Sequence, residues 1–286
     1  MRELRSYPTE AIILKQSDLG EADRILTLFT PRKGKFSAIA KGIRRPSSRK
    51  TGHLDLLCHT QLQMALGRNL DIVTQAQTIE SYPQMHNDMW YMACGFYLAE
   101  LVDRFVEDST PHFDVYDLLL ASLRTINNEA AQEVRSAQST DGQQTAEPIE
   151  LGEQEQPSIK NNATENLHIR LLMRHFEIYL LASVGYEPVL RSCANCDTEL
   201  RPEENGFSPS LGGALCPNCS HLWAYPISLN ALKVLRLLHR TDWAQVPRFQ
   251  LDTRLHTEME RAMHGLIRFH LERDMQSWSF LEMLRN

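Results

Sequence analysis

Residues 24–41 read RILTLFTPRKGKFSAIAK, and this stretch decides the fold of the first third of the chain. Two apolar or alternating segments, RILTLFT and KFSAIAK, flank a turn-forming PRKG sequence. In the second segment Phe36, Ala38 and Ala40 share one face of an extended strand. The pattern predicts two neighbouring strands, with this apolar face directed toward a core.

Further short strands are predicted on both sides of this hairpin. AIILKQS precedes it across the turn DLGEAD, and TQLQMALG and LDIVTQAQTI follow it as a second hairpin. Five short strands in about 70 residues suggest a small β-barrel, for which an OB-type or an SH3-like closure has a suitable size. We therefore assign residues 1–82 to an N-terminal domain built on a small β-barrel, and the fold class is α+β.

From Asp88 onward the apolar residues recur at helical spacing, which predicts a second, all-helical domain over residues 83–286. The predicted helices are listed by range: 89–106, 113–126, 166–186, 229–240 and 255–275. Gly185 is a plausible stop for the third of them, and Ser228 is a plausible N-cap for the fourth. The fifth is predicted as one long helix before the C-terminus.

Residues 127–166 interrupt the helical pattern. They hold eight acidic and two basic residues and are rich in Gln, Glu, Asn, Ser and Thr. Such a composition is typical of a disordered acidic loop or linker. We predict a disordered insertion here, inside the helical domain.

Composition limits the possible classes of protein. The 286 residues are 42% hydrophobic and carry 30 basic and 36 acidic side chains, as in an ordinary soluble globular protein. The sequence contains no run of about 18 apolar residues, so it predicts no membrane span. The first residues contain no apolar segment of the kind that a secretory signal requires. A cytoplasmic location and no membrane partner are the expectations.

Four of the six cysteines form two pairs, CANC at 193–196 and CPNC at 216–219, separated by 19 residues. Two thiolates three positions apart can point at one ion from a tight turn, and two such turns form a tetrahedral four-sulfur site. We predict one structural zinc ion held by Cys193, Cys196, Cys216 and Cys219 in a motif over residues 190–223. Two redox-active pairs are the alternative.

A zinc-dependent deaminase is a remote alternative. His175 and Glu177 form an H-x-E pattern upstream of the first cysteine pair, as in those enzymes. However, Ser192 and not a proline precedes Cys193, and four thiolates leave no position for a catalytic water. The sequence also lacks phosphate-loop, zinc-protease, nucleophile-elbow and dinucleotide motifs. We predict a protein that is not an enzyme.

Residues 31–50 carry eight basic side chains and no acidic one. Lys35 and Lys41 are predicted to project outward from the barrel, and the Pro/Ser-rich loop after them could follow a phosphate backbone. A solvated basic face is the plainer interpretation, but a basic groove on a small barrel is a common site for single-stranded nucleic acid. The predicted nucleic-acid-binding residues are Arg32, Lys33, Lys35, Lys41, Arg44, Arg45, Arg49 and Lys50.

Acidic residues also cluster near the first predicted turn. Asp18, Glu21 and Asp23 lie close together in sequence. Their turn context predicts capping bonds and pairing with Arg24 rather than metal binding.

The residues quoted above resemble the RecO family of bacterial recombination mediators. The resemblance begins in DLGEADRILTLFTPRKGKFSAIAKGIRRPSSR, continues through the cysteine motif and ends in LIRFHLERDMQSWSFLEML, which looks like the closing helix of that family. In the first segment the matching positions are Gly20, Glu21, Asp23, Arg24, Thr30, Gly34, Lys41, Gly42, Arg44 and Ser48. The acidic insertion at 127–166 departs from the family pattern.

The resemblance implies an N-terminal OB-fold, a helical C-terminal domain and a four-cysteine zinc motif. It further implies a nucleoid-associated DNA repair protein that binds single- and double-stranded DNA, anneals complementary strands and helps RecR load RecA. Family members bind the acidic C-terminal tail of single-strand binding protein through the helical domain. Basic residues on the amphipathic C-terminal helices are candidates for that contact: Arg236, Arg240, Arg261 and Arg268. An RNA-binding or transcription-linked zinc-ribbon module is the alternative function.

Overall fold

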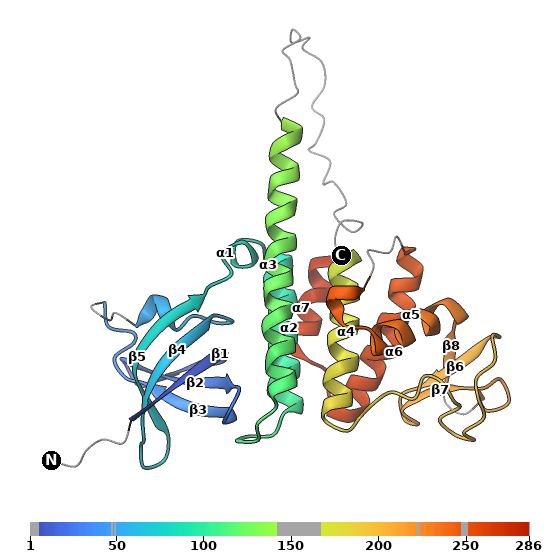
Figure 1. The fold of residues 1–286 in the computed structure, drawn as a ribbon, viewed down its shortest axis with the longest axis horizontal. Helices are drawn as coiled ribbons and strands as arrows, with labels where there is room; N and C mark the ends of the chain where they lie inside the picture. Colours follow the sequence, from blue (N-terminus) through green and yellow to red (C-terminus); the bar gives the residue numbers. More distant parts are fainter. Residues whose placement is uncertain are drawn as a thin grey trace, which may run out of the picture.

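The computed structural model describes residues 6–46, 48, 50–141, 167–221, 224–246 and 251–285. Five strands near the N-terminus form a closed barrel with the order β1-β2-β3-β5-β4 (Figure 1). Their bounds are β1 Ser6–Leu19, β2 Asp23–Thr30, β3 Gly34–Ala40, β4 His59–Ala65 and β5 Asp71–Glu80. All neighbouring pairs are antiparallel except β3 and β5, which pair in parallel. Each of the five predicted strands is present.

The barrel has an internal core and a second apolar face on the outside. Leu26 and Leu28 of β2 point into the core with Phe36 of β3, as the alternation predicted. On the opposite face of the first two strands, Ile12 and Phe29 are fully buried against the helical part of the chain. The two parts are therefore joined by a continuous apolar contact.

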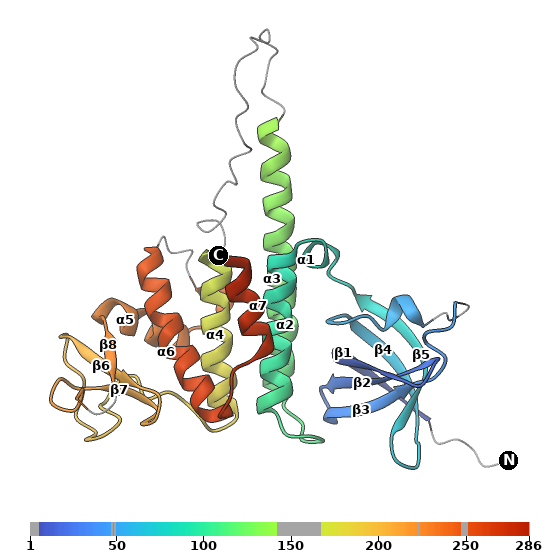
Figure 2. The same ribbon diagram turned by 180° about the vertical axis from the view of Figure 1, so that it is seen from behind.

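The rest of the described chain is mainly helical, and it packs beside the barrel (Figures 1 and 2). The helices are α1 Pro83–His86, α2 Met89–Phe105, α3 Phe113–Asp141, α4 Leu167–Ser183, α5 Leu229–Arg240, α6 Thr253–Leu271 and α7 Gln276–Arg285, with short 3-10 turns at Thr51–His53 and Trp243–Gln245. None of the helices in the described ranges is long and apolar enough to cross a membrane.

Two predicted helix boundaries are confirmed by their hydrogen bonds and backbone angles. The Ser228 side chain accepts a hydrogen bond from the Ala231 backbone N–H and so caps α5. After α4 the chain turns at Gly185, whose φ of 87° lies in the left-handed region that glycine adopts without strain.

Three predictions about the helical domain are wrong. The domain is not all-helical, because three short strands, β6 Asn205–Ser208, β7 Gly213–Leu215 and β8 Tyr225–Ile227, form a sheet of order β7-β6-β8. The fifth predicted helix is present as α6, but the segment LIRFHLERDMQSWSFLEML, which resembles one closing helix, is divided between α6 and α7. Its first part ends at Glu272, which has a left-handed φ of 56° and cannot continue an α-helix.

The third correction concerns the start of the acidic insertion. Helix α3 continues to Asp141, through residues predicted to be disordered. Ile126 and Ala130 lie four positions apart and are both buried, so they extend the apolar stripe of this helix beyond its predicted end. The remainder of the predicted insertion, residues 142–166, lies outside the described residues.

The barrel meets the helices at the β2–β3 hairpin. A Cβ atom on Gly34 would lie 2.1 Å from the backbone oxygen of Thr110, in the loop between α2 and α3. Next to it the Lys35 carbonyl accepts a hydrogen bond of 2.7 Å from the Ser109 backbone N–H. Gly34 also has a φ of 67°. Only a residue without a side chain fits this close approach.

Candidate nucleic-acid interface and metal centre

The basic stretch 31–50 does not form one continuous surface. It is divided by β3, whose seven residues extend over roughly 20 Å. Arg32 and Lys33 precede the strand at the end that meets the helices, whereas Lys41 and the residues after it follow its other end. The sequence prediction of a single basic groove therefore becomes two separate groups.

Lys35 does not project into solvent as predicted. Its side chain is only 10% exposed, and its ammonium group lies 3.5 Å from Asp103 and 3.3 Å from Asp108. It also donates a hydrogen bond to the backbone oxygen of Asp103. Although Lys35 points away from the barrel core, the helical domain covers that side, so this residue joins the two domains.

Two more of the predicted lysines have partners inside the barrel. Lys33 is 2.7 Å from Asp71 and lies over the Phe36 ring at 4.2 Å from its centre. Lys50 donates to the backbone oxygens of Lys41 and Val73, at 2.9 and 3.1 Å, and burial lowers its pKa. Both lysines contribute to closing the barrel.

The loop after β3 presents the remaining cations. Lys41 and Arg45 are exposed and have no ion pair within the described ranges, and the same holds for Arg32 before the strand. Arg44 is half-exposed and lies 3.2 Å from Asp18. Arg49 lies outside the described residues.

Hydrogen bonds hold this loop against the turn between β1 and β2. The Asp23 carboxylate accepts a bond of 2.7 Å from the Gly42 backbone N–H, and the Ala22 backbone oxygen accepts one of 3.0 Å from Arg44. Asp18 is shared, since its two oxygens lie 3.0 Å from Arg24 and 3.2 Å from Arg44. The predicted pairing with Arg24 is confirmed for Asp18, and Asp23 accepts a backbone N–H as a capping residue does.

This arrangement changes the local charge. Residues 31–50 are free of acids in the sequence, but in the structure Asp18 and Asp23 stand beside them. The loop is therefore less positive than its sequence suggests, and Lys41 and Arg45 are its two unpaired cations among the described residues. These two define what we call the barrel loop cations.

The four predicted cysteine ligands do lie together. The sulfur atoms of Cys193, Cys196, Cys216 and Cys219 are all within 4.8 Å of one another and could hold a metal ion. Cys196 Sγ is 3.8 Å from Cys216 Sγ, far beyond the roughly 2.05 Å of a disulfide bond. The four cysteines are free, whereas Cys58 and Cys94 are buried elsewhere.

Backbone N–H groups in the turns stabilise the thiolate form of Cys193 in this cluster. Burial alone would raise the pKa of Cys193, but backbone N–H groups of Cys216, Cys196 and Asn195 lower it to about 6. The Asn195 amide acts to lower the pKa of Cys219, yet desolvation and the neighbouring cysteines together raise it to about 11. Four thiolates repel one another, and a bound cation removes that repulsion.

Two turns and a small sheet position the cysteines. The Cys193 carbonyl accepts a bond of 2.8 Å from Asp197, which has a left-handed φ of 58°. The Cys216 carbonyl accepts 2.9 Å and 3.0 Å bonds from Cys219 and Ser220. Strand β7 ends one residue before Cys216. The sheet therefore positions the turn of Cys216 and Cys219 beside the turn of Cys193 and Cys196.

The deaminase-like pattern is not an active site in this structure. Both oxygens of Glu177 are occupied: Arg174 Nε donates to one at 2.7 Å, and the Tyr97 hydroxyl donates to the other at 2.6 Å. His175 Nε2 lies 3.2 Å from the Thr241 backbone oxygen. Neither residue belongs to the cysteine cluster.

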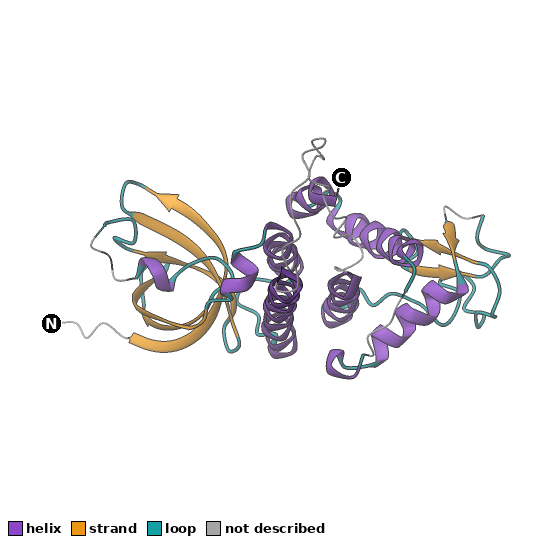
Figure 3. Cartoon of the chain, turned by 90° about the horizontal axis from the view of Figure 1, so that it is seen from above, coloured by secondary structure: helices purple, strands orange, loops and turns teal. Residues whose placement is uncertain are grey.

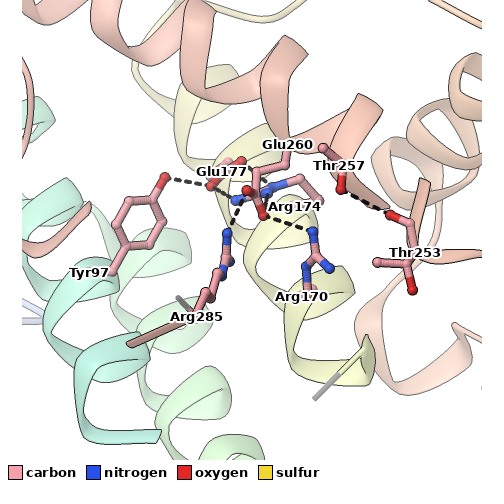
Figure 4. Close-up of polar contacts among 8 residues, drawn as sticks. All are labelled: Tyr97, Arg170, Arg174, Glu177, Thr253, Thr257, Glu260 and Arg285. Atoms are coloured by element: carbon pink, nitrogen blue, oxygen red, sulfur yellow. Dashed lines mark hydrogen bonds and ion pairs between the residues drawn. The ribbon is translucent and has the colours of Figure 1, made fainter. Parts of the chain in front are cut away.

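Glu177 instead belongs to a buried ionic network that the sequence analysis missed (Figure 4). Arg174 and Glu177 of α4 are almost completely buried, and Glu260 of α6 lies 3.3 Å from Arg174. Arg170 and Arg285 also contact Glu260, at 3.4 and 2.5 Å. Burial alone would raise the pKa of Glu260, but these three arginines lower it.

The four arginines proposed for the acidic tail of a partner have different surroundings. Arg236 donates to the Leu190 backbone oxygen at 2.7 Å, and Arg268 forms an exposed ion pair with Asp274 at 3.0 Å. Arg261 lies over the Tyr225 ring, 4.4 Å from its centre. Arg240 is exposed and unpaired within the described ranges. The four arginines therefore do not share one kind of environment.

Comparison with known proteins covers nearly the whole chain. The family described as "Recombination protein O N terminal" matches residues 1–82, and "Recombination protein O C terminal" matches residues 86–137 and 161–279. The gap between the last two ranges falls inside the predicted insertion. The N-terminal match ends at the predicted domain boundary.

Curated relatives match over most of their length. The DNA repair protein RecO of Roseiflexus sp. is 35% identical over 283 residues, which are 98% of this chain and 87% of that protein. The DNA repair protein RecO of Dehalococcoides mccartyi strain BAV1 is 32% identical over 286 residues, 100% of this chain and 98% of the relative. That of Symbiobacterium thermophilum is 30% identical over 98% of both chains.

Proposed function

The chain belongs to the RecO family of DNA repair proteins, and from this premise we propose that it is a DNA-binding recombination mediator without catalytic activity. It binds single- and double-stranded DNA, anneals complementary strands and, with RecR, assists loading of RecA onto strands coated with single-strand binding protein. It acts in the cytoplasm, in association with the nucleoid. The observation that carries this proposal is the match of both family domains across the chain.

We propose that the barrel is of the OB type and holds the DNA. Its closed order β1-β2-β3-β5-β4 supports this assignment. The phosphate contacts come from Lys41 and Arg45, the barrel loop cations, with Arg44 at their side. Arg32 and Arg49 remain candidates from the sequence, whereas Lys35 is excluded by its burial against the helices.

An annealing assay tests the proposed function. Complementary DNA strands coated with single-strand binding protein should anneal faster in the presence of the purified chain than in its absence. Single-stranded RNA should compete for binding more weakly than single-stranded DNA of the same length. No acceleration of annealing would contradict the proposal, and preferential RNA binding would favour the alternative function in RNA or transcription.

We propose that the four-cysteine cluster holds one structural zinc ion. In a tetrahedral site with Zn–S bonds of about 2.3 Å, neighbouring sulfurs lie about 3.8 Å apart. The distance between Cys196 Sγ and Cys216 Sγ, 3.8 Å, supports this fit. The ion would neutralise the thiolates and hold the two cysteine turns together, and four thiolates leave no position for a reacting water.

Metal analysis of the purified chain tests the zinc site. We expect one zinc per chain, and Cys216→Ser should release the ion and increase hydrogen exchange in residues 190–221 while the barrel stays folded. Cys58→Ser is the matched control, because that thiol lies outside the cluster. A chain without bound metal, or with both cysteine pairs oxidised under reducing conditions, would contradict the assignment.

A further inference from the structure

Helix α5 carries a basic face that the proposed barrel site does not use. Lys233, Arg236 and Arg240 follow one another at spacings of three and four residues, so they lie on one side of the helix. The opposite side packs into the core through four apolar residues: Ala231, Leu232, Leu235 and Leu238. Lys233 and Arg240 are exposed, and Arg236 is half-buried.

A fourth cation extends this face. Arg236 Nε donates to the backbone oxygen of Leu190 at 2.7 Å, which fixes its guanidinium group beside Arg191. Burial and then the like charge of Arg191 lower the pKa of Arg236. The planar guanidinium group of arginine can donate two parallel N–H bonds to the oxygens of a phosphate. We call Arg191, Lys233, Arg236 and Arg240 the α5 basic face.

No ion pair joins an acidic side chain to this face within the described part of the chain. The sequence contains no Asp or Glu from residue 205 to residue 241, a longer acid-free run than the one around β3. The carboxylates that contact the ends of α5 are already engaged. Glu258 accepts hydrogen bonds from Ser228 at 2.7 and 2.6 Å, and Glu187 lies 3.0 Å from His239.

The α5 basic face lies far from the barrel. Figures 1 and 3 place α5 and the small β6–β8 sheet on one side of the central helices and the barrel on the other. One stretch of phosphate backbone bound to the barrel loop cations would leave this second face free. The cysteine cluster also lies on the α5 side, since Arg191 is two residues before Cys193.

We propose that the α5 basic face binds the phosphate backbone of a second nucleic-acid strand while the barrel holds the first. This inference rests on the proposed function and deepens it, because annealing brings together two backbones that repel each other. Binding through a row of cations, with no aromatic stacking platform among them, is independent of base sequence. The cysteine motif contributes by holding Leu190 and Arg191 against α5.

Sedimentation of the full chain with a non-complementary DNA oligonucleotide tests the proposal. With oligonucleotide in excess at low salt, we expect one chain to carry two strands. Replacing Arg191, Lys233 and Arg240 by Gln should abolish the second strand and leave the affinity for the first unchanged; Arg236 is kept because it anchors Leu190. If the three cations contact three phosphates, wild-type affinity for the second strand should fall about 18-fold from 50 to 200 mM salt.

The matched control removes three exposed arginines in or next to α6, Arg254, Arg268 and Arg273, and should retain the second strand. A chain that binds one strand only, or that loses the second strand equally in the control, overturns the inference and leaves the proposed function intact. A chain that binds no DNA overturns both. Binding of an acidic peptide, but no second strand, to the wild type and not to the triple variant would assign the face to a protein ligand.

Discussion

Arginines in the barrel loop and arginines in the helical bundle have opposite surroundings. Arg45 follows β3, is exposed and has no carboxylate partner in the described ranges. Arg174 of α4 is 1% exposed and contacts both Glu177 and Glu260. The first kind of arginine is available to a ligand, whereas the second kind holds three helices together.

The difference teaches that local composition does not decide the role of a charge. Arg174 and Glu177 are three residues apart on an amphipathic pattern and would form an exposed pair on an isolated helix. Helices α6 and α7 cover them and supply Glu260 and Arg285. The cost of desolvating these charges is offset only while every partner is present.

The largest expected effect comes from removing a carboxylate from the buried network. Glu260→Gln would remove the carboxylate that contacts Arg170, Arg174 and Arg285, and among the described residues only Arg174 would keep another, Glu177. We expect the free energy of unfolding to fall by about 3–5 kcal/mol, because breaking a buried ion pair leaves uncompensated charge in the interior. Denaturant unfolding followed by circular dichroism measures this loss.

An exposed ion pair provides the control for that measurement. Arg268 and Asp274 are 3.0 Å apart, but their side chains are 62% and 50% exposed. Asp274→Asn should therefore cost less than about 1 kcal/mol. Equal losses for the two variants would mean that burial does not distinguish the two kinds of charge in this protein.

The next effect concerns the contact that places the barrel beside the bundle. Gly34→Ala forces a Cβ to within 2.1 Å of the Thr110 oxygen at a φ of 67°. We expect a loss of roughly 2–4 kcal/mol in unfolding free energy from left-handed strain and overpacking. Gly20→Ala is the control, since Gly20 has a φ of 60° but nothing within 4 Å of its Cβ position. It should lose only about 1–2 kcal/mol, and similar losses for both would contradict a tight contact at Thr110.

Structural elements that are determined by residues close together in the sequence were predicted from the sequence. The alternation in KFSAIAK placed Phe36 in the barrel core, and the cap at Ser228 gave the start of α5. The spacing within and between the CxxC pairs brought four cysteines into one cluster. In these cases the residues that determine the structure lie within a few positions of one another or follow a fixed spacing.

Features whose cause is distant in the sequence were missed. Lys35 alternates as a surface residue would, but Asp103 and Asp108 of the helical domain cover it. Nothing around Lys35 in the sequence indicates these partners. The extension of α3 had a weak local signal, the four-residue spacing of Ile126 and Ala130, which the surrounding polar composition masks.

A smaller effect appears only in acidic solution. Burial, and then the positive charges of Arg170 and Arg174, lower the pKa of His256 to about 4, although Glu260 opposes this shift. In the unfolded chain His256 binds a proton near pH 6.5, whereas in the folded chain it binds one only near pH 4. The free energy of unfolding should therefore fall as the pH decreases from about 6.5 to about 4.

Replacing His256 isolates its share of this decline. Both of its ring nitrogens are buried and have no hydrogen-bond partner among the described residues, so leucine removes the proton site without breaking a bond to any of them. We expect His256→Leu to lose less stability than the wild type between pH 7 and pH 5, as measured by thermal unfolding. Burial also lowers the pKa values of His175 and His264, so the variant should still lose some stability as the pH falls. An unchanged pH profile would show that His256 is not a buried neutral group.

On the surface, changing charges should affect ligand binding and leave stability nearly unchanged. Replacing Lys41 and Arg45 by Gln removes two phosphate contacts, so the slope of log K against log salt for single-stranded DNA should become less steep by about 1.4. The unfolding free energy should change by less than about 0.5 kcal/mol. Lys15 and Arg68, two other exposed barrel cations, form the control pair. A larger change in slope for the control pair would mean that the DNA binds on another side of the barrel.

The smallest expected effect has the opposite sign. Asp18 neutralises Arg24 and Arg44, at 3.0 and 3.2 Å, next to the barrel loop cations. Asp18→Asn keeps the size of the side chain but releases these guanidinium groups, so one more phosphate contact becomes available. The salt slope should steepen by about 0.7, and DNA should bind more tightly at low salt. The gain in affinity should disappear at high ionic strength, where the screening length falls to about 3 Å. If Asp18→Asn leaves binding at low salt unchanged, the acids of the β1–β2 turn do not limit the charge of this loop, and the phosphates lie elsewhere.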